Sequence, residues 1–282
     1  MAQINAKKSL GQNFLHNNAI VEKIAQAGLS HQPQTILEIG PGMGVLTRVL
    51  TEKTPDSSRV FAVEKDDRLI PILDETFAQE IKSGKLTLIH KDILDLSLSE
   101  IGIGNLPSQT NDYAVIANIP YYITGEILKK FLEIEPKPKA LILLVQKEVA
   151  DRIMAREKHT ILSTITHILA KPKVIAVVGR HNFSPQPNVD SAILELVPHT
   201  NSDLNTFSTQ EFKKLTEFIK ISFHSRRKTL IANLRGHYDI SEAQKVLSEL
   251  NLPLDIRAED IEPTVWFLLH KKIPATLAEA AQ

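Results

Sequence analysis

The stretch that most constrains the fold runs from Ile36 to Thr47 and reads ILEIGPGMGVLT. A β-branched run at 35–39 leads into glycines at 40, 42 and 44, and residues 45–50 then favour a helix. Glycine lets such a turn adopt positive φ and lets a ligand approach the backbone closely. A strand, a tight glycine turn and a helix are typical of the nucleotide pocket of an open α/β sheet. The alternative interpretation is a glycine-rich connection in any α/β domain.

The pattern of apolar runs predicts one α/β domain followed by helices. Strands are expected at 35–39, 59–64, 85–90, 113–117 and 140–146, with helices between them and a first helix at 17–27 that ends at Gly28. This alternation predicts a parallel, doubly wound sheet. A late strand pair is expected at 174–178 and 192–197, and after Pro198 only helical periods follow, at 211–223, 226–234, 241–250 and 259–270. We therefore expect a Rossmann-like domain at 1–198 and a small all-helical domain at 199–282.

Composition excludes several classes of protein. The 282 residues include 33 basic and 33 acidic side chains and no cysteine, which rules out disulfides and thiolate metal sites. Neither a signal peptide nor an apolar run of about 20 residues is present, so we expect a soluble intracellular protein. Residues 1–21, 158–189 and 218–238 contain Lys and Arg but no acid. Three such stretches favour local contacts with an anion over chance clustering of solvated charges.

Polar side chains stand at the ends of three successive predicted strands. The Glu64 carboxylate could accept hydrogen bonds from both hydroxyls of a ribose, and both NAD and S-adenosylmethionine contain such a ribose. Asp92 could accept a hydrogen bond from the exocyclic amine of adenine. Asn118 is the polar residue that follows the next strand. The G-x-G-x-G spacing and the lack of a basic residue in the turn argue against a dinucleotide. The carboxylates favour a cationic ligand such as a sulfonium.

Residues Asn118 to Tyr121, Asn-Ile-Pro-Tyr, indicate the chemistry. The turn offers an amide oxygen, an exposed carbonyl and an aromatic face, and proline makes it rigid. An exocyclic amine donating both its hydrogens there would have its lone pair aimed at a methyl donor. Catalysis would then rest on positioning and on oxygen dipoles. The alternative is an ordinary Asn-Pro turn with a core tyrosine.

Over nearly its full length, the chain resembles the ribosomal-RNA adenine N6-dimethyltransferases, specifically the bacterial enzymes that act on the small subunit. The matching segments are KKSLGQNFL at 7–15, EIGPGMGVLT at 38–47, VEKDDRL at 63–69, KDIL at 91–94, NIPYY at 118–122, FSPQPNVDSA at 183–192 and FHSRRKTLIANL at 223–234. The resemblance implies S-adenosylmethionine as cofactor, no metal ion, and methylation of N6 on two adjacent adenosines near the 3′ end of 16S rRNA.

The resemblance also implies roles for individual residues. It places cofactor contacts on Asn13, Leu15, Gly40, Gly42, Glu64, Asp92 and Asn118. Asn118, Pro120, Tyr121 and Phe183 become the catalytic clamp on the target base, with Phe183 stacking opposite Tyr121. Residues 7–15 become a lid over the cofactor, and the C-terminal helices become an RNA-facing domain. A cytoplasmic monomer acting on the small ribosomal subunit, away from membranes, is expected.

The basic run at 226–228 is a candidate RNA contact. If Ser225 caps the helix that follows, Arg226, Arg227 and Lys228 fill its first turn, where cations oppose the helix dipole by about 0.3–1 kcal/mol each. We therefore expect a compensating phosphate at these three residues; a continuous helix with a solvated face is the alternative.

Two other functions stay open at this point. One is adenine methylation of another nucleic acid, such as large-subunit RNA or DNA. The other is a non-catalytic role as a ribosome-assembly or RNA-binding factor.

Overall fold

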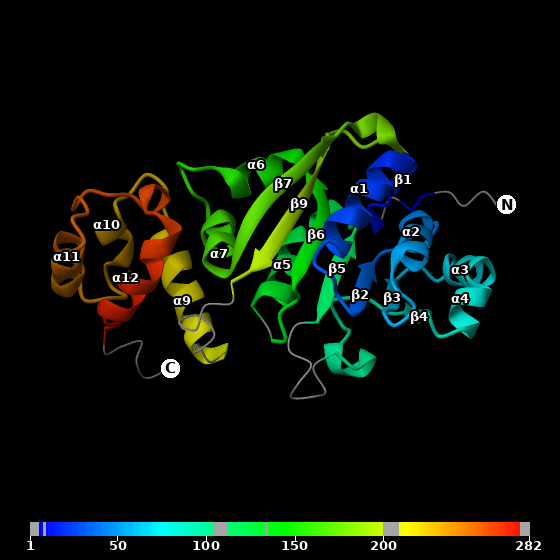
Figure 1. Cartoon of the computed structure of the whole chain (residues 1–282). Helices are drawn as coiled ribbons and strands as arrows, with labels where there is room; N and C mark the ends of the chain where they lie inside the picture. Colours follow the sequence, from blue (N-terminus) through cyan, green and yellow to red (C-terminus); the bar gives the residue numbers. More distant parts are fainter. Residues whose placement is uncertain (1–5, 8–9, 104–111, 134, 200–208, 277–282) are drawn as a thin grey trace. The chain divides into compact units, whose positions relative to one another are not determined.

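The computed structural model describes residues 6–7, 10–103, 112–133, 135–199 and 209–276, and the chain divides into two compact units (Figure 1). The first unit contains Met1–Ala150 and Lys171–Pro198, and the second contains Asp151–Ala170 and His199–Gln282. The second unit thus includes the twenty residues Asp151–Ala170, which we expected from the sequence to belong to the first domain. The reason is local packing, because the helix at 161–169 contacts the C-terminal helices and the His159 N–H donates to the Glu259 carbonyl at 2.8 Å.

A seven-stranded sheet forms the centre of the first unit, in the order β4-β3-β2-β5-β6-β9-β7. The five strands expected in the first 150 residues are confirmed to within one residue, and the late pair is present as the neighbours β9 and β7, of which β7 begins four residues earlier than expected. Their bounds are β2 Thr35–Ile39, β3 Arg59–Glu64, β4 Leu86–His90, β5 Tyr113–Ala117, β6 Ala140–Gln146, β7 Ala170–Val178 and β9 Ser191–Pro198. A separate small sheet pairs β1, Phe14–Leu15, with β8, Phe183–Ser184, in antiparallel orientation.

The register of the parallel strands brings their carboxyl ends to one edge. Ile39, the last residue of β2, lies opposite Val63 of β3 and Ala117 of β5. Glu64, the last residue of β3, lies opposite His90 of β4. The turns after these four strands therefore leave the sheet side by side, which is the edge where α/β proteins bind ligands.

Helices follow the strands in the expected alternation. Their bounds are α1 Asn18–Leu29, α2 Val45–Lys53, α3 Ile70–Thr76, α4 Ala78–Lys82, α5 Thr124–Leu132 and α6 Lys147–Met154. Helix α1 packs against α2, β5 and β6. The prediction that Gly28 ends α1 is wrong, since the helix continues to Leu29. Gly28 instead allows close approach to the sheet, because a Cβ there would stand 2.3 Å from Ile116 Cδ1.

The second unit has an aromatic core built from its helices. Phe218 lies edge-on to Tyr238 with ring centroids 4.9 Å apart, and Phe223 stacks on the fully buried Trp266 at 5.5 Å. The helices are α7 Ile161–Leu169, α9 Thr209–Ser222, α10 Leu230–Leu234, α11 Ile240–Glu249 and α12 Trp266–Lys272. None of the helices within the described ranges is both long and apolar enough to cross a membrane.

The basic run at 226–228 is not helical, which corrects both interpretations of it. Helix α10 begins only at Leu230, and its N-cap is Thr229, whose hydroxyl accepts from the Ala232 N–H at 3.2 Å. Ser225 belongs to the preceding turn, where its N–H donates to the Asn233 side chain. Asn233 also donates to the Ser222 and Ser225 carbonyls, which closes the turn. The three cations therefore do not oppose a helix dipole.

Glu38 is a buried acid in the middle of the sheet. It is 1% exposed, and neither of its carboxyl oxygens has a hydrogen-bond partner among the described residues. Burial raises the pKa of Glu38 to about 8, and the charge of Glu64 acts in the same direction. Glu38 is therefore protonated in the folded protein at neutral pH, because the neutral acid is easier to bury than the ion.

We predict that Glu38→Gln removes a pH-dependent loss of stability. The pKa of Glu38 is higher in the folded state, so its contribution to stability is fully present below about pH 4.5 and is lost as pH rises to about 8. The slope is at most roughly 1.4 kcal/mol per pH unit. Urea unfolding at pH 5.5, 7 and 8.5 measures it. Parallel free-energy curves for the two proteins would contradict a buried proton at this site.

Candidate active site

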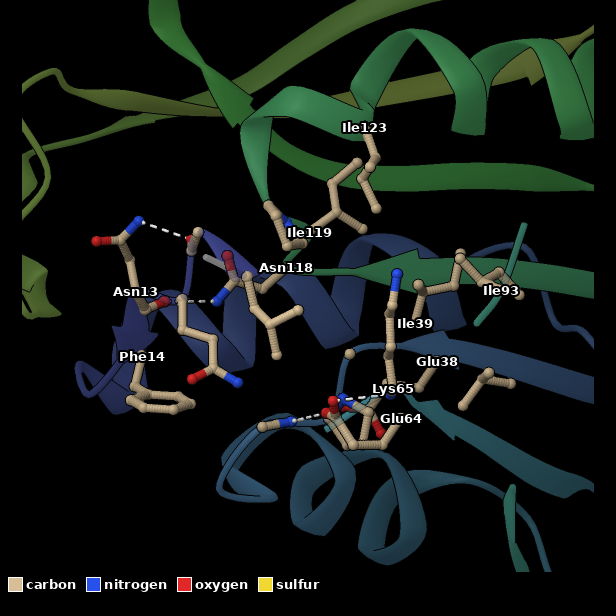
Figure 2. A pocket seen from close by; sticks show the side chains of 18 of the residues that line it. Asn13, Phe14, Glu38, Ile39, Glu64, Lys65, Ile93, Asn118, Ile119 and Ile123 are labelled. Carbon is tan, nitrogen blue, oxygen red and sulfur yellow. Dashed lines mark hydrogen bonds between the residues drawn. The ribbon is translucent and has the colours of Figure 1, made fainter. Parts of the chain in front are cut away.

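A pocket opens at the carboxyl edge of the sheet, wholly within the first unit (Figure 2). Five segments line it, and four of them leave the ends of β2, β3, β4 and β5. The fifth is the N-terminal segment, which supplies residues 10–15. The lining segments are therefore 10–15, 38–43, 45–46, 63–65, 91–94 and 118–123, together with Val21.

The glycine turn needs glycine at each of its three positions. Gly40, Gly42 and Gly44 have φ of 68°, 58° and 79°, in the left-handed region. A Cβ on Gly42 would stand 3.2 Å from the Phe14 ring, and one on Gly44 would stand 2.5 Å from the Phe77 ring. The turn therefore combines an unusual backbone path with tight packing on both sides.

Glu64 reaches the pocket from the end of β3 and ties two turns together. Its Oε2 accepts from the Gly42 N–H at 3.2 Å, and its Oε1 accepts from the N–H groups of Lys65 and Asp66 at 2.9 and 2.8 Å. Burial raises the pKa of Glu64, although these three donors work against the rise. The carboxylate is thus fixed in direction and presents oxygen to the pocket.

Asp92 follows β4 and pairs with Lys65, whose Nζ lies 2.6 Å from Asp92 Oδ2. Burial of Asp92 alone would raise its pKa, but Lys65 and the Leu94 N–H, which donates at 3.0 Å, more than compensate. The pKa of Asp92 therefore lies below its ordinary value. An ionised carboxylate at this position can only accept hydrogen bonds.

Asn118 and Tyr121 stand after β5 with defined orientations. Asn118 Nδ2 donates to the backbone carbonyl of Asn13 at 3.3 Å, as the dashed line in Figure 2 shows. The Tyr121 hydroxyl lies 2.7 Å from Ser191 Oγ, and burial raises the pKa of this phenol. Asn118, Pro120 and Tyr121 all line the pocket, so the structure brings them together with Gly40, Gly42, Glu64, Asp92, Asn13 and Leu15.

Phe183 is the one predicted clamp residue that does not line the pocket. It is 3% exposed and belongs to the hydrophobic core, where it pairs through β8 with Leu15. Its stacking opposite Tyr121 stays a prediction. Arg226, Arg227 and Lys228 are exposed in the second unit, and their contact with RNA also stays a prediction.

Sequence reasoning missed three polar residues of the site. Glu38 lines the pocket, and the only signal for it was an acid within the otherwise apolar strand TILEI. Lys65 lines the pocket too, but its pairing with Asp92 is long-range. Gln12 Nε2 donates to Asp66 Oδ2 at 2.7 Å across 54 residues, which no local pattern predicts.

The residues present fit S-adenosylmethionine. Two carboxylates, an amide and a glycine cradle meet at one edge, and the buried carboxyl of Glu38 adds polar capacity that no described residue satisfies. The glycine turn at 40–47 has the spacing G-x-G-x-G and not the G-x-G-x-x-G of a pyrophosphate cradle. Within the described part of the chain, no three His, Asp or Glu side chains are grouped so as to hold a metal ion.

Comparison with known proteins places the chain in a family. The family model described as ribosomal RNA adenine dimethylase matches residues 3–273. Among curated relatives, ribosomal RNA small subunit methyltransferase A of Mycoplasma mobile is 38% identical over 95% of this chain and 98% of its own length. The protein of the same name from Dehalococcoides mccartyi strain 195 is 36% identical over 94% of this chain and 88% of its own length.

Two solved structures have a fold similar to that of this chain. A dimethyladenosine transferase from Plasmodium falciparum matches with a TM-score of 0.74 and 24% identity, over 91% of this chain and 95% of that chain. The 23S rRNA methyltransferase ErmE matches with a TM-score of 0.70 and 22% identity, over 92% and 99%. The chain therefore belongs to the ribosomal RNA adenine dimethylase family and is an S-adenosylmethionine-dependent methyltransferase.

Proposed function

We propose that this protein transfers methyl groups to N6 of two adjacent adenosines near the 3′ end of 16S rRNA in the small ribosomal subunit. The names of the curated relatives support the small subunit, since they are small-subunit methyltransferases. The geometry of Asn118 supports an exocyclic amine as the group that receives the methyl.

The orientation of the Asn118 amide is the observation that carries the proposal. The Asn118 NH2 group donates a hydrogen bond to the Asn13 carbonyl. Asn118 Oδ1 is therefore free to accept a hydrogen bond from a substrate, since no described residue donates to this oxygen. A side chain held in this way presents an acceptor, and the rigid Pro120 follows two residues later. The N6 amine of adenine is a donor that this acceptor suits.

The protein supplies position and charge stabilisation to the transfer. When bound, S-adenosylmethionine provides a methyl group on a positively charged sulfur with a neutral leaving group. Asn118 Oδ1 accepts one N–H of the target amine, the oxygen dipoles of the turn stabilise the positive charge that develops on nitrogen, and the methylated nitrogen then loses one proton to water. Tyr121, fixed through its hydroxyl by Ser191, offers a ring on which the base can stack.

Further features of the proposal concern the partner and the setting. Arg226, Arg227 and Lys228 are exposed on one turn, and an exposed cluster of cations suits the RNA backbone. We place the protein in the cytoplasm as a monomer that acts on the small subunit. Phe183 would move from the core to face Tyr121 when the target base enters.

We predict that Asn118→Ala lowers kcat about 100-fold or more, because removing one preorganised polar group from an active site has effects of this size. The measurement is methyl transfer from labelled cofactor to unmodified small subunits, at saturating cofactor. Asn18→Ala, on the exposed start of α1, is the matched control and should keep full activity. A kcat for Asn118→Ala within threefold of the wild type would contradict the proposal.

We predict that Arg226→Ala/Arg227→Ala weakens binding to small subunits and flattens its salt dependence. Each lost phosphate contact should reduce the slope of log K against log salt by roughly 0.7–0.9. Binding at several salt concentrations measures this. Lys213→Ala/Lys214→Ala removes the same charge from exposed positions of α9 and is the control. The RNA-contact role is wrong if affinity and slope match the wild type.

A further inference from the structure

The N-terminal strap, which we define as residues 11–15, contacts several separate segments in and around the pocket. The Gly11 backbone lies against Pro120 and Tyr122, and a Cβ there would stand 3.3 Å from each of these side chains. Phe14 packs over the glycine turn at Gly42, as described above. The strap therefore contacts the glycine turn and the segment that follows β5.

Two further strap residues contact Asn118 and Phe183, to which we assign roles in the reaction. The Asn13 carbonyl accepts from Asn118 Nδ2, and Leu15 pairs with Phe183. Figure 2 shows Asn13 and Phe14 on the strap, with the Asn118 side chain turned toward Asn13. The orientation of the Asn118 amide thus depends on where the strap lies.

One polar interaction fastens the strap on the cofactor side of the pocket. Gln12 Nε2 donates to Asp66 Oδ2 at 2.7 Å, and Gln12 Oε1 accepts from the Lys7 N–H at 2.7 Å and from Arg68 Nη2 at 3.5 Å. The side chain of Asp66 is fully buried and also accepts from Arg68 Nε at 2.9 Å and Nη2 at 2.6 Å. Arg68, with help from Gln12, holds the pKa of Asp66 far below its ordinary value.

The anchor at Asp66 is continuous with the cofactor site. The Asp66 N–H donates to Glu64 Oε1 at 2.8 Å, so the residue that receives the strap also orients a carboxylate of the pocket. Hydrogen bonds to an ionised group are among the stronger ones, and Gln12 Nε2 shares Asp66 Oδ2 with Arg68 Nη2. Gln12 is therefore a firm tie rather than a passing surface contact.

We propose that Gln12 is a positioning residue whose bond to Asp66 fastens the strap, so that the cofactor is retained and the Asn13 carbonyl holds the Asn118 amide in its accepting orientation. The inference rests on the proposed function in one respect, which is that Asn118 Oδ1 meets the target amine. Gln12 itself touches no reacting atom and acts through Asn13 and Asn118.

The test compares two substitutions at position 12 in the full-length protein. Gln12→Glu keeps the shape but removes the donor and faces Asp66 with a second carboxylate. Gln12→Lys keeps a donor for Asp66 and is the rescue variant. Gln79→Glu makes the same change of charge at an exposed position of α4 and is the control. Calorimetric titration with S-adenosylmethionine gives the cofactor Kd, and initial rates on small subunits give kcat at saturating cofactor.

We expect Gln12→Glu to weaken cofactor binding about tenfold and to lower kcat about tenfold or more, because small misplacements of a catalytic group have effects of this size. Gln12→Lys should lie within about threefold of the wild type in both quantities. Circular dichroism melting should be alike for all variants, so that a general loss of folding cannot imitate the result.

Three outcomes would overturn the inference. The first is wild-type Kd and kcat in Gln12→Glu. The second is an equal loss in Gln12→Lys, which would trace the effect to the lost Oε1 contacts with Lys7 and Arg68 and not to the bond with Asp66. The third is weakened cofactor binding with unchanged kcat, which would remove the link to Asn118. If wild-type protein transfers no methyl to small subunits, the proposed function fails, and the cofactor Kd values still decide whether Gln12 fastens the strap.

Discussion

Parallel pairing of β2 with β3 and β5 is the constraint on which the rest of the site depends. Because Ile39 lies opposite both Val63 and Ala117, the glycine turn, Glu64 and Asn118 emerge at the same level of the sheet. A shift of one residue in either pairing would turn Glu64 or Asn118 to the other face of the sheet. The apolar, buried strands hold this register, since every residue of β5 and four of five in β2 are buried.

The sheet edge alone would leave a row of polar groups open to water. The N-terminal strap lies along this edge and closes one side of the pocket. Its contacts run from Asp66 through Gly42 to Asn118 and Phe183, so a segment far away in the sequence joins the proposed cofactor side of the pocket to the proposed base side. A methyltransferase needs both sides at once, because transfer depends on how donor and acceptor are placed relative to one another. The strap is one element that contacts both.

Much of this architecture could be predicted from the sequence, for reasons that differ between residues. The strands were predictable because buried β-strands are short β-branched runs, and Glu64, Asp92 and Asn118 were predictable because they follow such runs. The resemblance to a family then pointed to Asn13 and Leu15, which no periodicity indicated; both line the pocket, and their contact with the cofactor stays a prediction. The helix expected at 226–234 failed because Ser225 and Thr229 are both capping residue types, and only the contacts of Asn233 select Thr229. Gln12 with Asp66, and Lys65 with Asp92, were out of reach because they join residues distant in sequence.

We propose that this pocket delivers methyl groups to N6 of adenine in small-subunit rRNA. The most direct test is to incubate the wild-type protein with labelled S-adenosylmethionine and unmodified small subunits, then to digest the 16S rRNA to nucleosides. Large subunits from the same cells serve as the parallel acceptor. The account predicts label in N6,N6-dimethyladenosine from the 3′ region of 16S rRNA. Label in another nucleoside, or in large-subunit RNA alone, would contradict it.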